Sequence, residues 1–286
     1  MVRAGSGRGT DVLWAASLRP STLRERVAAA VAGGFGGVSV SPGDAGGPGS
    51  GRSGTDSPEE VARWAAGQGV ALVVVDSVIE WYPHQPPRRM LAATEYSVTQ
   101  MLGVCDRYGV DSLGALAPFP SEAPVEELAG CFASLCDQAA EHGLRVQLEF
   151  TPFPPVPDLA TAWQIVQQAG RRNGGILLDS WHFFRGRPDL ELLSSIPGDR
   201  IMGVQLSDGR AEFRESLLKD TFRHRELPGE GGFDLVGLLN VLHRTGGLNQ
   251  VGPEVLSEEL QALEPAEAAV RLAVATEKTM AAALGP

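Results

Sequence analysis

The chain has 286 residues, of which 43% are hydrophobic, and its 24 basic and 35 acidic side chains give a net charge of −11. This length suits one α/β barrel of typically about 250 residues. The acidic balance argues against a nucleic-acid partner, which a basic face would bind. The chain has no apolar run of about 18 residues, so no membrane span is predicted.

The cysteines and the first residues bear on the compartment. Residues 1–10 hold two arginines and several glycines but no apolar stretch like that of a secretory signal, and we expect a flexible N-terminus there. The three cysteines, Cys105, Cys131 and Cys136, are odd in number and lack CxxC spacing. Such cysteines are typical of buried thiols in a reducing compartment, so we expect a cytoplasmic protein.

Eight short apolar runs follow one another along the chain, each followed by a helical pattern. The predicted strands cover residues 11–18, 37–42, 70–79, 110–119, 144–153, 174–181, 201–208 and 249–257. Their spacing matches βα units of roughly 30 residues. Eight such units favour a closed barrel, because an open parallel sheet leaves two edges unpaired. The sequence therefore predicts an α/β fold, a single (β/α)8 TIM barrel domain over residues 1–286.

Helix and loop signals lie between these runs. Ser21 and Ser57 stand where N-caps are expected, and Pro58 suits a first helical position. The expected helix ends carry glycines at positions 69, 109, 143 and 170. The glycine cluster 33–37 precedes a strand, so it indicates a helix end and a tight turn, not a dinucleotide-binding loop. The glycine-rich stretch 43–56 is predicted to be a mobile βα loop.

Four consecutive strands carry one oxygen-bearing side chain each near their carboxyl ends, where such barrels place their chemistry. Because side chains alternate along a strand, the apolar neighbours of these residues face the helices and the polar residues face inward. The inward set is Glu149, Asp179, Gln205 and Glu254. Three converging carboxylates repel one another unless a cation or protons compensate.

Two kinds of compensation are open. Pairing with arginine is one, and the arginines near in sequence are Arg145, Arg185, Arg223 and Arg225. A divalent metal is favoured for the whole set, because all four residues match in position and parity. Oxygen ligands suit Mn²⁺ or Mg²⁺, and Co²⁺ or Zn²⁺ are the alternatives.

Motifs around these residues resemble a known family. The segments are Leu148-Glu149-Phe150, Leu178-Asp179-Ser180-Trp181-His182, Val204-Gln205-Leu206-Ser207-Asp208, Leu227-Pro228-Gly229-Glu230-Gly231 and Gly252-Pro253-Glu254. Together they resemble the xylose isomerase-like sugar phosphate isomerase/epimerase superfamily. The resemblance covers roughly residues 11–280, with all its specific motifs after residue 145.

The resemblance implies a metal site and substrate contacts. In the family one metal is held by Glu, Asp, His and Glu from strands five to eight, which here are Glu149, Asp179, Gln205 and Glu254. Gln205 departs from the family, which usually has His there. The resemblance also implies that His182 contacts a substrate oxygen and that Arg225 does likewise, although Arg223 lies two residues away.

Such a site implies chemistry at a hydroxy-carbonyl compound. A metal bound to the carbonyl stabilises an enediolate, and Glu149 and Glu254 then act as ligands and as general bases on opposite faces. The leading prediction is a metal-dependent isomerase or epimerase of carbohydrate metabolism acting on a sugar or keto-polyol. The alternative is a lyase similar to the inosose and dehydroshikimate dehydratases, because both reactions share the enediolate. His182 would polarise or protonate a substrate oxygen.

Aromatic residues follow several predicted strands and indicate an apolar pocket. The further predicted substrate contacts are Trp14, Trp81, His84, Phe119 and Trp181. No cluster of basic residues suited to a phosphate follows the last two strands, which favours a cyclic polyol, a keto acid or a bulkier ring as the small-molecule substrate.

Two further readings remain open. An endonuclease IV-like hydrolase needs several histidine ligands and a basic groove, and the five histidines and the charge of −11 count against it. The second is a non-catalytic barrel that binds a small ligand or a partner, an interpretation that remains possible because Gln205 replaces the family's usual histidine. The apolar C-terminal helix 265–284 is expected to close the barrel exterior, and leftover apolar surface there could support a homodimer.

Overall fold

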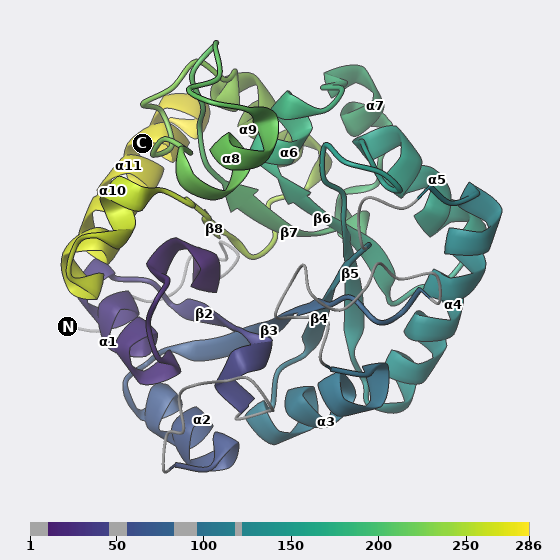
Figure 1. Cartoon of the computed structure of the whole chain (residues 1–286), viewed down its shortest axis with the longest axis horizontal. Coiled ribbons are helices and arrows are strands. Elements are labelled where there is room, and N and C mark those ends of the chain that lie inside the picture. Colours follow the sequence, from purple (N-terminus) through teal and green to yellow (C-terminus); the bar gives the residue numbers. More distant parts are fainter. Residues whose placement is uncertain (1–10, 46–55, 83–95, 118–121, 286) are drawn as a thin grey trace.

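The computed structural model describes residues 11–45, 56–82, 96–117 and 122–285. Its eight parallel strands pair in chain order, from β1 beside β2 to β7 beside β8. Figure 1 shows them as an inner ring surrounded by helices. The predicted single (β/α)8 TIM barrel is confirmed. Within the described residues, no helix is long and apolar enough to cross a membrane.

The strands are β1 (Val12–Leu13), β2 (Gly37–Val40), β3 (Ala71–Val78), β4 (Ser112–Leu116), β5 (Arg145–Glu149), β6 (Gly174–Asp179), β7 (Ile201–Leu206) and β8 (Val251–Pro253). The helices are α1 (Leu23–Gly33), α2 (Pro58–Gly67), α3 (Val98–Tyr108), α4 (Val125–Glu141), α5 (Leu159–Ala169), α6 (Ser180–Arg185), α7 (Leu190–Ser195), α8 (Leu217–Arg223), α9 (Leu235–Thr245), α10 (Glu258–Gln261) and α11 (Pro265–Leu284). Short 3₁₀ turns are η1 (Ala15–Leu18), η2 (Pro42–Ala45) and η4 (Gly198–Arg200).

All eight predicted strands are present, and each is shorter than its apolar run. The first run, 11–18, contributes two residues to β1 and then turns into η1. Trp181 closes the sixth run in the sequence, but it lies in α6. Periodicity alone does not separate a short apolar helix from the strand that precedes it, which explains both differences.

Helix ends follow the local signals closely. Ser57 caps α2 in a capping box with Glu60, as predicted. The cap of α1 is Thr22, one residue after the predicted Ser21, because Glu25 stands three residues beyond Thr22 and completes a capping box with it. The predicted glycine C-caps at positions 109 and 170 are confirmed, and the cluster 33–37 ends α1 at Gly34.

The apolar side chains divide into two layers. The large core between sheet and helices contains the residues expected to face outward, among them Val146, Leu148, Phe150, Ile176, Leu178, Val204, Leu206, Val251 and Val255. A second cluster fills the barrel interior with Val12, Trp14, Val73, Val74 and Leu177. Glu149 and Asp179 end their strands, Gln205 lies one residue before the end of β7, and Glu254 follows β8.

Closure of the ring depends on a close approach between the first and last strands. A Cβ atom at Gly252 would lie 1.7 Å from the Val12 carbonyl oxygen, so only glycine fits there. Ser17 of η1 ties the two ends together: its Oγ donates to Pro253 O at 3.2 Å and accepts from Val255 N at 2.9 Å. Outside this seam, α11 packs on α1 (Figure 1).

Some predicted features lie outside the described residues. These are the N-terminal segment 1–10, residues 46–55 of the predicted loop 43–56, His84 and Phe119. The start of that loop is held in place: η2 forms there, and Asp44 accepts a hydrogen bond from Ser41 N at 2.8 Å and pairs with the buried Arg26.

Candidate metal centre and active site

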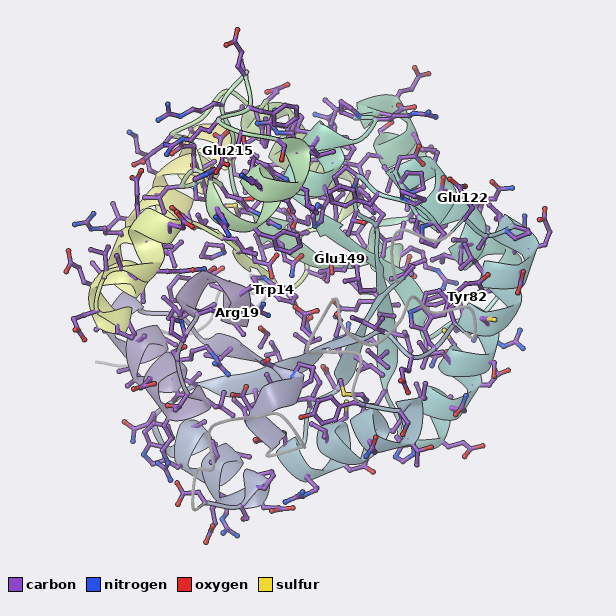
Figure 2. The ribbon with its side chains drawn as sticks, viewed as in Figure 1. Trp14, Arg19, Tyr82, Glu122, Glu149 and Glu215 are labelled. Carbon is purple, nitrogen blue, oxygen red and sulfur yellow. The ribbon has the colours of Figure 1, made fainter. Side chains whose placement is uncertain are left out.

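The four predicted ligands lie at one end of the barrel. Glu149 ends β5, Asp179 ends β6, Gln205 lies in β7, and Glu254 follows β8; all four are buried. Strand register places Gln205 beside Asp179, whereas Glu149 pairs with Leu177, two residues before Asp179, and Glu254 lies two residues after Gly252, the partner of Gln205. Figure 2 shows Glu149 near the middle of the ring.

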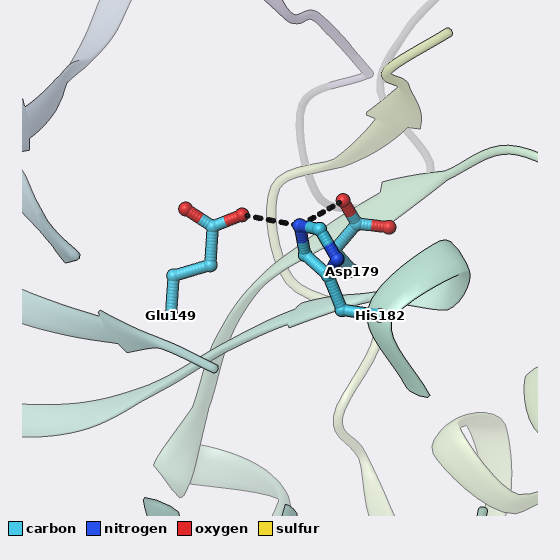
Figure 3. A group of neighbouring side chains, drawn as sticks. All are labelled: Glu149, Asp179 and His182. Carbon is cyan, nitrogen blue, oxygen red and sulfur yellow. Dashed lines mark ion pairs between the residues drawn. The ribbon is translucent and has the colours of Figure 1, made fainter. Parts of the chain in front are cut away.

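His182 joins Glu149 and Asp179 in a group of possible metal-ligand atoms (Figure 3). Its Nε2 lies 3.4 Å from Glu149 Oε1 and 3.3 Å from Asp179 Oδ2. One ligand atom from each residue lies within 4.8 Å of the other two. Asp179 caps α6 through a 2.7 Å bond from Trp181 N, and this starts the helix that carries His182 back over it.

Sequence reasoning assigned His182 to substrate and missed its place between two carboxylates. The signal was available in the D-x-x-H spacing: positions three apart on a helix share a face. The structure brings His182 and Asp179 together by this spacing, and Glu149 meets them from the neighbouring strand.

Arg225 pairs with two acids of the site. Its Nη1 lies 2.7 Å from Asp179 Oδ2 and 3.4 Å from Glu254 Oε2, and it also donates to the Glu254 carbonyl oxygen at 3.3 Å. Arg223 instead lies 3.5 Å from Glu258 on the exposed side. Of the two arginines that the sequence left open, the structure brings Arg225 into the site, and arginine pairing accompanies the proposed metal ligands.

Gln205 presents a free acceptor to the interior. Its Nε2 donates to Glu254 Oε1 at 3.0 Å, while its own Oε1 is buried without a hydrogen-bond partner in the described structure. A buried acceptor of this kind is costly unless a donor or a cation meets it. With Glu149, Asp179 and His182 close by, the residues present fit a divalent cation.

The carboxyl groups of the site differ in proton affinity. Burial raises the pKa of Glu254 well above its usual range; Arg225 opposes this, and Asp179, Glu149 and Asp76 add to it. Burial also acts to raise the pKa of Asp179, but Arg225 and His182 outweigh it and leave that pKa below the usual value. The surroundings have therefore shifted the pKa values of Asp179 and Glu254 in opposite directions, although both acids pair with Arg225.

The predicted aromatic contacts take different places. Trp14 is fully buried in the barrel interior, and its Nε1 has no partner among the described residues. Trp181 is fully buried, donates to Thr221 Oγ1 at 3.0 Å and has Arg225 5.6 Å above its ring. Trp81 donates to Leu116 O at 3.0 Å and packs on Phe132 of α4, so its contacts are with the core.

Asp76 of β3 is an acid of the interior that the sequence interpretation missed. Its Oδ1 is buried without a hydrogen-bond partner in the described structure, and it faces Gly114 of β4. The strand register shifts between Val75 and Val78, so simple alternation from the apolar residues does not place Asp76. The signal was a lone acid within the apolar run 70–79.

A family model for the xylose isomerase-like TIM barrel matches residues 27–275. The chain belongs to this family. It is 29% identical to a 3-dehydroshikimate dehydratase of Pseudomonas aeruginosa over 252 aligned residues. The aligned segment covers 84% of this chain and 37% of the relative. It is 30% identical over 176 residues to an inosose isomerase of Bacillus subtilis, covering 59% of this chain and 62% of the relative.

A solved structure described as IOLI protein with a binding zinc atom has the same fold, with a TM-score of 0.80 at 20% identity over 95% of this chain and 98% of that chain. The chain spans little more than a third of the dehydratase and less than two thirds of the isomerase. The relatives are thus enzymes of the lyase and isomerase types.

Proposed function

We propose that the protein is a divalent-metal-dependent lyase that removes water from a cyclic hydroxy ketone. The observation that carries this is the group of Glu149, Asp179 and His182 at the carboxyl end of the barrel, with Glu254 joined to Asp179 through Arg225. The match to a dehydratase over 84% of the chain supports dehydration over the predicted isomerisation, since the isomerase match covers 59%.

Glu149, Asp179, His182 and Gln205 would hold the cation, Gln205 through its free Oε1. Mn²⁺ and Mg²⁺ suit the oxygens, and the histidine nitrogen also admits Zn²⁺ or Co²⁺. When bound, the cation supplies Lewis acidity to a substrate carbonyl oxygen and so acidifies the neighbouring C–H group. Arg225 keeps Asp179 ionised and oriented at 2.7 Å.

Glu254 is the proposed base for the α-proton. It lies outside the tight group of ligand atoms, and burial raises its pKa, which makes its carboxylate a stronger base. Gln205 Nε2 holds Glu254 Oε1 at 3.0 Å and fixes its orientation. The carbanion formed at the α-carbon expels the β-hydroxyl group, which leaves as water once its oxygen receives a proton.

Isomerisation is the second candidate, because it begins with the same proton abstraction and several inosose isomerases match the chain. It differs in the return of the proton to a neighbouring atom. Glu149 ends β5, three strands away from β8 and Glu254, and is the residue suited to return it.

The test is an assay of the metal-free protein after reloading with Mn²⁺. Substrates are 3-dehydroshikimate and inosose, and the assay in D₂O follows deuterium entering the α-position together with the ultraviolet absorbance of an unsaturated product. A lyase gives both signals on one substrate, and an isomerase gives exchange with a new ketone and no loss of water.

The matched control is Glu259→Gln, which removes an acid that is 80% exposed at its side chain and remote from the barrel interior. It should behave as wild type. Absence of both exchange and turnover with every metal offered, on both substrates, would contradict the proposed function and favour the non-catalytic barrel.

A further inference from the structure

The carboxyl group of Asp76 lies against Gly114, where the absence of a side chain makes room for it. It belongs to β3 (Ala71–Val78), and a Cβ atom at Gly114 of the next strand would lie 2.7 Å from its Oδ1. Any side chain at position 114 would therefore displace the carboxyl group. Gly114 pairs with Gln147 of β5, two residues before Glu149 on the same strand.

The charges around Asp76 belong to the active site. Glu149 of β5 and Asp179 of β6 repel its charged form, and Arg19, which follows η1, attracts it. Asp76 in turn raises the pKa of Glu254 beyond β8. Figure 2 shows Arg19 and Glu149 near the middle of the barrel. Asp76 therefore faces the same interior space as the proposed metal ligands and base.

The other interior acids already have partners. Asp179 pairs with Arg225 and accepts from Trp181 N, Glu254 accepts from Gln205, and Glu149 lies 3.4 Å from His182. Among the described residues, Asp76 is the acid of the barrel interior that makes neither a hydrogen bond nor an ion pair. The residue as a whole is partly buried, and its Oδ1 is buried without a partner; a carboxyl oxygen in that position favours the neutral, proton-bearing form.

We propose that Asp76 is a catalytic residue that gives its proton to the departing β-hydroxyl group during dehydration. This rests on the proposed function. The α C–H bond breaks and its proton goes to Glu254, the α–β double bond forms, the β C–O bond breaks, and the leaving oxygen takes the Asp76 proton to become water. Asp76 is left as carboxylate and Glu254 as acid, and exchange with solvent restores both.

The proton affinity of Asp76 suits this role. In the chain without a metal, burial, then Glu149 and Asp179, raise its pKa to about 7 against the opposing pull of Arg19. A general acid works best when its pKa lies near the working pH.

The experiment separates proton abstraction from loss of water. Asp76→Asn keeps the shape of the side chain and removes the proton. In the Mn²⁺-loaded protein with 3-dehydroshikimate in D₂O, we expect water loss to fall at least about 100-fold while α-deuterium exchange stays within about 3-fold of wild type. Asp111→Asn, which changes an acid that is 67% exposed at its side chain and paired with Arg145, is the matched control.

Two results would overturn the proposal. One is water loss within about 3-fold of wild type; the other is a parallel fall of exchange and water loss, which would place Asp76 among the groups that hold the site together. A wild-type protein that shows neither exchange nor water loss contradicts the proposed function instead, so the two failures are distinct.

A measurement on the wild type needs no variant. Because the acid must carry its proton, the ratio of water loss to exchange should fall as pH rises, with Glu149, Asp179, Glu254 and Arg19 as the neighbouring charges that set the midpoint. A ratio that stays constant over the whole range in which the protein remains folded would overturn the proposal even if Asp76→Asn does not fold.

Discussion

Asp76 and Asp179 show how strongly surroundings change the same functional group. Arg225 at 2.7 Å and His182 at 3.3 Å favour the ionised form of Asp179 and lower its pKa, although burial opposes them. Asp76 has no such partner, so burial governs and its pKa rises to about 7. One residue is thereby suited to hold a cation and the other to carry a proton.

The raised pKa of Asp76 predicts a pH-dependent cost in stability. The pKa of Asp76 is 3.8 in the unfolded chain and about 7 in the folded chain, so the folded chain binds this proton more tightly. The contribution of Asp76 to the free energy of unfolding is therefore fully present below about pH 4 and is lost as the pH rises to about 7. In the protein freed of metal with a chelator, Asp76→Asn should therefore be more stable than wild type at pH 8, by at most about 4 kcal/mol.

Urea unfolding of both proteins at a series of pH values measures this difference. The two curves should converge near pH 4. If the variant is less stable than wild type at pH 8, the Asp76 carboxylate has a favourable partner and the reasoning fails.

A second residue-scale prediction concerns Glu254. Glu254→Gln removes the proposed base and keeps the volume, so α-deuterium exchange and water loss should both fall by about 10² to 10⁴-fold. Both rates are measured on the Mn²⁺-loaded protein, with metal content determined alongside. Retained exchange would assign the base to another residue, with Glu149 first.

At the scale of elements, Asp208 organises the segment that delivers Arg225. Its Oδ1 accepts from Gly209 N at 2.8 Å and Phe233 N at 2.9 Å, and its Oδ2 accepts from Gly229 N at 3.1 Å. Its backbone pairs with that of Glu226 in both directions. The residue beside Arg225 is thus fixed to the end of β7.

Asp208→Asn should loosen this segment. An amide NH₂ group cannot accept from the backbone donors that now meet a carboxylate oxygen, so we expect a loss of about 1–3 kcal/mol in the free energy of unfolding, together with a higher KM as Arg225 loses its position. Thermal unfolding and steady-state kinetics measure the two effects.

Asp234→Asn is the matched control, because Asp234 caps α9 by accepting from Gly237 N and asparagine caps helices equally well. Should Asp208→Asn be as stable as this control and equally active, the segment has another support.

The sequence located the elements well and their ends less well. Starts such as Gly37, Gly174 and Ile201 coincide with the observed strands, because turns and helix caps have strong local signals. The ends depend on where the chain leaves the sheet, and an apolar stretch such as 15–18 packs equally well as a 3₁₀ turn.

The same limit applied to the site. Alternation placed Glu149 and Glu254 correctly at the barrel end, because the apolar partners on their strands mark the outward face. Asp76 escaped this reasoning because of the register shift in β3, and the pairing of Arg225 with Asp179 joins residues 46 positions apart in the chain. Contacts of that range follow from the closed fold and have no local signature.

At the scale of the whole molecule, the net charge of −11 and the buried acids at one end of the barrel lead us to expect that a bound cation stabilises the fold. A ligand present at about 100 times its Kd stabilises a protein by about 2.7 kcal/mol. For a chain of this size that corresponds to a rise in Tm of about 5 to 10 °C.

Thermal melts with EDTA, and after addition of Mn²⁺, Mg²⁺ or Zn²⁺, measure this shift. The metal giving the largest rise is expected to be the one that supports turnover. Equal melting temperatures in EDTA and in every metal would contradict metal binding. Arg225 and protons would then be the only groups that compensate the charges of the acids.

The tie between Ser17 and the segment after β8 bridges more than 230 positions of the chain. Contacts of such separation form late in folding, because a long loop must close first. A chain emerging from the ribosome therefore carries Glu149, Asp179 and Asp76 well before Glu254 exists. The proposed base is therefore the last of these acids to be synthesised, so a chain that ends before β8 would hold the proposed metal ligands without the group proposed to abstract the proton.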